Sequence, residues 1–189
     1  AELLPEDSLE CADPWLRDWE RALRRTLIKR DIGDDSVLEP YFEVGAVFVC
    51  EPANVWGVDI QRRDSGADGG AWAYDPPLKS EADFDRLRMP RFAFDEETTS
   101  ALLERAEGLL GDILPVRAVS GPPLSATLGT YAADLYGLQE MMTGMVVVPE
   151  SMHRLMAHLR DAALAGMDAV EESGMLSPNN TGPMICSDP

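Results

Sequence analysis

The stretch LPVRAVSGPPLSAT, residues 114–127, decides the fold class of this chain. Residues 114–120 are apolar almost throughout, with Arg117 as the exception, and this pattern is typical of a parallel strand covered on both faces. A glycine and two prolines follow, and they predict a stiff loop. Because α/β proteins bind ligands beyond the carboxyl ends of parallel strands, Ser120, Ser125 and Thr127 are candidates to hold a carboxylate or a carbonyl group. An ordinary strand-to-helix loop is the alternative interpretation.

Helical patterns lie on both sides of this stretch. Apolar spacing predicts a helix over residues 128–142 and another that begins at Pro149 and ends at Gly174. Upstream, Asp95 is a predicted N-cap of a helix that ends near Gly111. Strand and helix patterns that alternate in this way indicate an α/β fold.

The first helix is predicted from the pair Asp13-Pro14, in which Asp can cap and Pro suits the first helical position, to a stop at Gly33. One face of this helix carries four arginines. They form either a solvated helix face or an anion-binding patch: Arg17, Arg21, Arg24 and Arg25.

Strand patterns occupy the region between the first two helices. We predict strands over residues 41–50, 55–61 and 71–74, with a glycine- and aspartate-rich turn over residues 64–70. The resulting β-hairpin would carry Trp56, Trp72 and Tyr74, either as a lid over a ligand or packed on the core. Residues 80–83 (SEAD) resemble a capping box and predict a short helix.

Composition and charge exclude several classes of protein. The 189 residues include 34 acidic and 16 basic side chains, for a net charge of −18, which argues against binding to nucleic acid or to an anionic membrane surface. The hydrophobic fraction of 45% argues against disorder. No apolar run approaches the ~20 residues of a membrane span, and the first residues do not resemble a secretory signal. Three cysteines without a CxxC pair are typical of reduced thiols, so we expect a cytoplasmic protein.

We expect a single domain over residues 1–189, with a helical segment at 1–40, a strand and hairpin region at 41–90, and β/α units at 91–189. The sequence contains no Walker loop, no dinucleotide-binding fingerprint and no GxSxG nucleophile elbow, three motifs that carry the chemistry of many enzymes. The two histidines, His153 and His158, are five residues apart and diverge around one predicted helix, so we expect no metal site. We assign no catalytic residue.

Three segments, taken in order, resemble the uroporphyrinogen decarboxylase superfamily, which includes cobalamin-dependent methyltransferases and many uncharacterised barrel proteins. Residues 116–125 (VRAVSGPPLS) are similar to the family's third-strand region, where a Gly-Ala-Pro-aromatic-Thr segment leads into a helix. Residues 136–142 (YGLQEMM) resemble its Gly-x-Glu-x-Leu segment, and residues 148–156 (VPESMHRLM) its Pro-Glu-x-x-His-x-Leu helix start. The resemblance spans about residues 15–180 and corresponds to the N-terminal half of the family's barrel.

The resemblance implies an N-terminal part of a (β/α)8 TIM-type barrel with an added β-hairpin, since an intact barrel needs about 250 residues. It also implies one-carbon chemistry, either corrinoid-linked methyl transfer or decarboxylation. The family's Arg-Gln-Ala-Gly-Arg segment and its zinc-binding His-x-Cys motif have no match here. The alternative function is a non-catalytic binding or assembly module on the same scaffold.

The resemblance further implies which residues would line the substrate cleft. These are Ser120, Ser125, Thr127, Tyr131, Asn179 and Asn180. No cofactor is expected within this chain, and a corrinoid or zinc would belong to the complete protein. The implied partners are a small-molecule substrate or a corrinoid protein, together with a missing second half of the barrel or a second copy of the chain.

Overall fold

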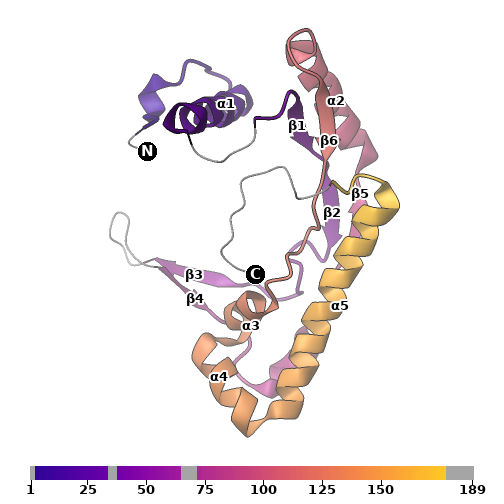
Figure 1. Ribbon diagram of the computed structural model, residues 1–189. Helices are drawn as coiled ribbons and strands as arrows, with labels where there is room; N and C mark the ends of the chain where they lie inside the picture. The colour runs from indigo at the N-terminus through magenta and orange to yellow at the C-terminus, as the bar shows by residue number, and fades with distance from the viewer. Residues whose placement is uncertain (1–2, 34–37, 65–71, 178–189) are drawn as a thin grey trace. The chain divides into compact units, whose positions relative to one another are not determined.

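The computed structural model describes residues 3–33, 38–64 and 72–177. The chain divides into two compact units, one that contains the first 42 residues and one that extends from Glu43 to Ser177 (Figure 1). Each unit is described by itself.

The first unit consists of a short 3-10 helix, η1 (Glu6–Ser8), and helix α1 (Pro14–Ile32). The predicted ends of α1 are confirmed: the Asp13 side chain accepts hydrogen bonds from the N–H groups of Trp15 and Leu16, and Gly33 adopts the left-handed conformation at φ 77°. A side-chain N-cap and a left-handed glycine are local signals that begin and end a helix.

The arginine face of α1 binds oxygen atoms of the segment before it. Arg17 donates to the carbonyl groups of Leu9 and Cys11, and Arg21 pairs with Glu6 at 2.9 Å. In turn, the Glu20 carboxylate accepts the N–H groups of residues 10 and 11, and these hydrogen bonds lower the pKa of Glu20 to about 2. These polar contacts attach the N-terminal segment to α1.

The second unit contains three small sheets. Strand β1 (Phe42–Gly45) is the neighbour of β6 (Val116–Val119). Strand β2 (Phe48–Glu51) pairs antiparallel with β5 (Arg91–Phe94), and β3 (Gln61–Asp64) pairs antiparallel with β4 (Trp72–Asp75). The hairpin is thus confirmed, with its first strand later in the sequence than predicted. The prediction of one strand over residues 41–50 is wrong in detail, because two strands with different partners share that segment.

The predicted strand over residues 55–61 is also wrong for most of its length. The Asn54 side chain accepts the N–H of Gly57 at 3.0 Å and donates to Asp59 at 2.8 Å, which folds the segment into a turn. Val55 and Gly57 have positive φ values of 66° and 76°. Trp56 and Val58 still point into the core and are 4% and 5% exposed, so the alternating pattern reflects burial without a strand. Trp56 therefore lies in the core and not on the hairpin.

The helices of the second unit cover most of its remaining length. They are η2 (Glu81–Arg86), α2 (Glu96–Leu110), α3 (Leu128–Tyr136), α4 (Leu138–Val147) and α5 (Pro149–Ser173). The predicted capping of α2 by Asp95 and the predicted bounds of α5 are confirmed. The single helix expected over residues 128–142 is wrong, because Gly137 has a φ of 100° and breaks the helix into α3 and α4.

A parallel connection joins β6 to the segment after α5. The N–H of Ser120 donates to the carbonyl of Met175, and the N–H of Ser177 donates to the carbonyl of Ser120, both at 3.0 Å. Ser120 and Leu176 thereby form a parallel bridge, with α3, α4 and α5 between them along the chain. The expected parallel pairing is thus present as a single bridge at Ser120. The expectation that the strand is covered on both faces is wrong, because β6 is only partly buried and Arg117 is exposed. The fold is mixed α/β, and within the described ranges the strands do not close a barrel.

The core of the second unit is built around α5. Leu155, Leu159 and Ala162 of this helix are at most 1% exposed and pack against Trp56 and Leu135. Among the helices of the described residues, none combines the length and the hydropathy that a membrane span requires.

Candidate functional site

Three side chains that the sequence predicted as a site lie together, and we call Ser125, Thr127 and Tyr131 the hydroxyl cluster. The backbone N–H of Ser125 donates to Tyr131 Oη at 3.0 Å. Ser125 Oγ lies 3.2 Å from Tyr131 Oη and also forms a hydrogen bond with Thr127 Oγ1. The three hydroxyl oxygens therefore form one connected hydrogen-bonded group.

The loop after β6 and the first turn of α3 bring these groups together. Thr127 is the residue before α3, and its carbonyl accepts the N–H of Tyr131, one helical turn later. Since Tyr131 Oη accepts a backbone N–H, its own hydrogen remains available for donation to Ser125 or to a ligand. A phenol and two hydroxyls in this arrangement can hold a carboxylate or carbonyl group.

Ser120 is not part of this group. Its hydroxyl donates to the carbonyl of Gly121 at 2.9 Å, and its backbone takes part in the parallel bridge to Leu176. Asn179 and Asn180 lie outside the described residues, so their predicted place in the site stays a prediction.

Trp56 packs against the ring of Tyr131, a member of the hydroxyl cluster, and His158 lies beside Trp56; sequence reasoning missed both contacts. The Trp56 ring centroid lies 5.4 Å from that of Tyr131 and 6.3 Å from that of His158. His158 is half-buried on α5, and its Nε2 is buried without a hydrogen-bond partner among the described residues. A buried polar atom without a partner is uncommon in folded proteins and indicates a position where a ligand or water can bind.

Burial lowers the pKa of His158. A hydrogen bond with the backbone of Arg88 and the charge of Asp161 oppose this effect, but burial is the larger cause. A histidine whose charged form is disfavoured is neutral at pH 7. The bond to the backbone carbonyl places the proton on Nδ1, so the partnerless Nε2 is a hydrogen-bond acceptor.

We predict that this histidine makes the protein less stable in mild acid. The unfolded chain binds the proton with the ordinary pKa of 6.5, whereas the folded chain binds it only at lower pH. Stability from the neutral form is therefore complete above pH 6.5 and falls as the pH drops below that value. His158→Gln should reduce this fall, measured as the urea midpoint between pH 7.5 and 5. The exposed His153 gives the control, since the His153→Gln variant should lose as much stability between pH 7.5 and 5 as the parent chain. An equal change in both variants would contradict the prediction.

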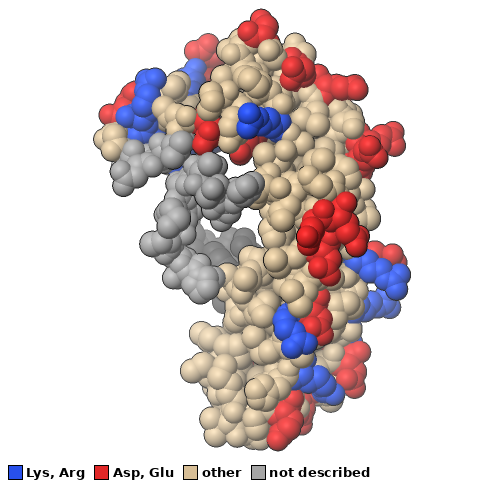
Figure 2. All heavy atoms as spheres, turned by 45° about the vertical axis from the view of Figure 1, so that its right-hand side comes forward, with Lys and Arg blue, Asp and Glu red and all other residues tan. Residues whose placement is uncertain are grey.

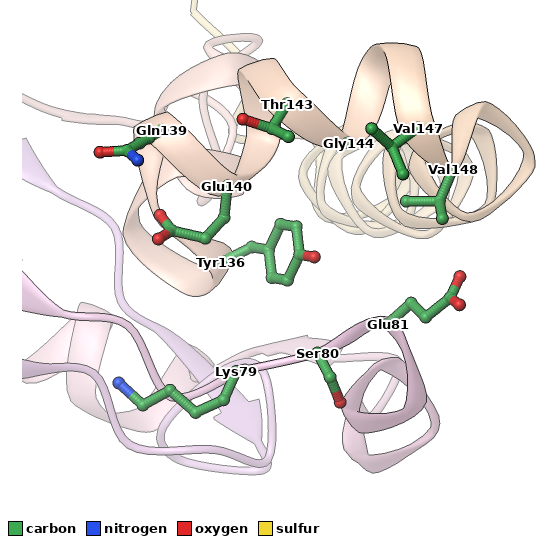
Figure 3. A pocket seen from close by; sticks show the side chains of 10 residues that line it. All are labelled: Lys79, Ser80, Glu81, Tyr136, Gln139, Glu140, Thr143, Gly144, Val147 and Val148. Carbon is green, nitrogen blue, oxygen red and sulfur yellow. The ribbon is translucent and has the colours of Figure 1, made fainter.

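A cavity of about 440 Å³ with a mixed polar and apolar lining lies in the second unit, between the start of η2 and helix α4 (Figure 3). Figure 3 shows Tyr136 at its centre, with Glu140 on the α4 side and Lys79 and Ser80 on the opposite side. The ammonium group of Lys79 pairs with Asp75 at 2.7 Å. The cavity combines hydroxyl, amide and carboxylate groups, but the hydroxyl cluster does not line it.

Metal and thiolate chemistry have little support in the described residues. Within them, no three side chains of the His, Cys, Asp and Glu types come together to hold a metal ion. Burial raises the pKa of the Cys50 thiol, and burial together with Glu20 raises that of Cys11. Both thiols are therefore protonated at neutral pH and are weak nucleophiles.

The fold and the site together define a mixed α/β protein with a hydroxyl cluster in the loop that follows β6 and the parallel bridge at Ser120. Comparisons of the chain with protein-family models, with curated proteins and with solved structures found no match.

Proposed function

We propose that this chain is the N-terminal part of a (β/α)8 barrel with an added β-hairpin, and that the protein is uroporphyrinogen-decarboxylase-like. Its activity would be one-carbon chemistry, either corrinoid-linked methyl transfer or decarboxylation. The observation that carries the proposal is the parallel pairing of Ser120 with Leu176 around α3, α4 and α5. A strand, a helical crossover and a parallel strand are the repeating unit of such barrels.

The hydroxyl cluster supports the position of the proposed substrate cleft. Ligand sites in β/α barrels lie in the loops that follow the carboxyl ends of the strands, and Ser125, Thr127 and Tyr131 follow β6 directly. The role of these three groups is to position the substrate by hydrogen bonds to a carboxylate or carbonyl oxygen. Ser120, Asn179 and Asn180 complete the lining in this proposal.

A complete barrel and its cofactors require more than these residues. A (β/α)8 barrel has about 250 residues, so further strands would come from a second segment or a second copy. A corrinoid or zinc would supply the methyl-transfer chemistry when bound to the complete protein or to a corrinoid partner protein. The described residues bring no three ligating side chains together, so we assign no zinc ligand to this chain.

Binding measurements test the proposal directly. We expect the gene product that contains this chain to bind methylcobalamin, a methylated amine or a polycarboxylate, as measured by absorbance titration or calorimetry. Tyr131→Phe should weaken binding of the small molecule by about five- to tenfold, because one neutral hydrogen bond contributes about 1 kcal/mol.

Tyr136 provides the matched control for this test. It lies on the same helix as Tyr131, but its ring packs edge-on against Phe84 and lines the separate cavity, so Tyr136→Phe should leave binding unchanged. Absence of binding for all three compound classes would contradict the proposed function. Equal losses in both variants would contradict the assignment of the hydroxyl cluster.

The exposed apolar face of α4 favours a second function, a binding or assembly module on the same scaffold. Leu138 and Val146 of this helix are 63% and 83% exposed. Under this alternative the chain binds none of the three compounds and associates with another protein surface.

A further inference from the structure

Four methionines line one cavity between helices α4 and α5, which we call the methionine cavity. It has a volume of about 310 Å³. The methionines form two pairs, Met141 and Met145 on α4 and Met152 and Met156 on α5. Because side chains four residues apart lie on the same face of a helix, each helix contributes one pair of thioether groups to the cavity.

The tight connection between the two helices, visible in Figure 1, holds the two pairs close together. Val148 alone separates α4 from α5, and its N–H donates to the carbonyl of Gly144 at 2.9 Å. Gly144 also lets α5 approach, since a Cβ atom added there would lie 2.9 Å from the Met152 sulfur. Met141 and Met152 are buried, whereas Met145 is 52% exposed. Each helix therefore holds one methionine in the core, and the cavity is accessible from solvent at Met145.

The donor atoms of the cavity select a soft metal ion. Thioether sulfur is a soft ligand that binds Cu(I), whereas Ca²⁺ and Mg²⁺ prefer oxygen ligands. Among the described residues, the lining contains no Asp, Glu or Cys side chain, and its one imidazole belongs to His153. Imidazole also binds copper, so His153 adds a nitrogen donor beside Met152 and Met156. This donor set suits Cu(I) and not the ions that bind to carboxylates.

Charge favours a cation as the ligand. The chain carries a net charge of −18, which attracts cations toward its surface. In the described part of the chain, the lining of the cavity contains no lysine or arginine that would repel a positive ion. Figure 2 shows that the lower left of the molecule, where Figure 1 places α4, is largely free of charged side chains. A soft cation therefore suits both the donor atoms and the charge of the chain.

We propose that the methionine cavity binds Cu(I) through the sulfur atoms of its methionines, with the His153 imidazole as an additional ligand. Methionine side chains are unbranched and flexible, so their sulfur atoms can converge on one ion while the helix backbones stay in place. A thioether has no proton to lose, so the methionine ligands, unlike thiolates, bind the ion without releasing protons.

Competition for Cu(I) with the chromogenic chelator bicinchoninate, under anaerobic conditions with ascorbate, tests the proposal. Thiolates also bind Cu(I), so the titration uses the full chain with its three cysteines replaced by serine. We expect this chain to take up a single Cu(I) ion.

Leucine substitutions separate the role of sulfur from that of packing. Leucine conserves the volume and the apolar character of methionine but lacks the sulfur. Met145→Leu and Met156→Leu should each weaken Cu(I) binding at least as much as the loss of an outer-shell partner does, about tenfold or more. Met142→Leu is the matched control: Met142 is 58% exposed on α4 but does not line the cavity, so its substitution should leave the affinity unchanged. Circular dichroism of each variant checks that the chain still folds.

NMR of the chain labelled with ¹³C at the methionine methyl groups gives a second readout, with Ag(I) as an analogue of Cu(I) that is stable to air. The methyl signals of the four lining methionines should shift on titration, while the signal of Met142 should not. A parent chain that takes no Cu(I) from the chelator would overturn the proposal, as would equal affinities in the three leucine variants. Binding of the neutral dye N-phenyl-1-naphthylamine without any binding of Cu(I) would assign the cavity to an apolar ligand instead.

Discussion

Leu159→Ala is expected to destabilise the second unit by about 3–4 kcal/mol. Leu159 is fully buried in the middle of α5 and belongs to the core that includes Trp56, Leu135 and Leu155. Truncation removes three carbon atoms, one methine and two methyl groups, and leaves a cavity; such substitutions cost about 2–5 kcal/mol in closely packed cores. A domain of this size has roughly 5–15 kcal/mol of stability, so the loss would be a large fraction of the total.

Urea unfolding followed by circular dichroism measures this loss. The matched control is Leu164→Ala, five residues later on the same helix, where the side chain is 48% exposed. Since it removes the same atoms with little change in packing, it should cost less than about 1 kcal/mol. A cost of this small size for Leu159→Ala as well would show that α5 does not hold the core as described.

Elements defined by local chemistry could be predicted from the sequence. Asp13 and Asp95 cap their helices through hydrogen bonds to residues two or three positions away, so the signal and its partner lie in the same short segment. Gly174 ends α5 in the left-handed conformation for the same local reason. Ser125 and Thr127 could be named as candidates from the local pattern, because they follow a predicted strand directly, whereas Tyr131 was named only through the family resemblance.

Elements defined by distant partners could not be predicted in this way. Strand β5 is only four residues long, and its pairing with β2 joins segments about 40 residues apart. The break between α3 and α4 depends on a single glycine, Gly137, within a continuous apolar pattern. The contact of His158 with Trp56 could not be predicted either, because it joins residues about 100 positions apart.

Trp56→Ala should destabilise the second unit about as much as Leu159→Ala does, and it should also change the candidate site. The side chain is 4% exposed in the core, and truncation of such a tryptophan costs about 3–5 kcal/mol. Its ring contacts both Tyr131 and His158, so its loss removes the packing partner that the two rings share.

We expect Trp56→Ala to lower the stability of the second unit by about 3–5 kcal/mol. Trp56→Phe should lower it by less, because phenylalanine keeps part of the aromatic contact. Trp15→Ala in the first unit is the control, and it should leave the unfolding of the second unit unchanged. With less packing around His158, its pKa should also move back toward 6.5, as measured by NMR titration. If Trp56→Ala left this pKa unchanged, the burial of His158 would have another cause, and the hydroxyl cluster and His158 would belong to separate sites.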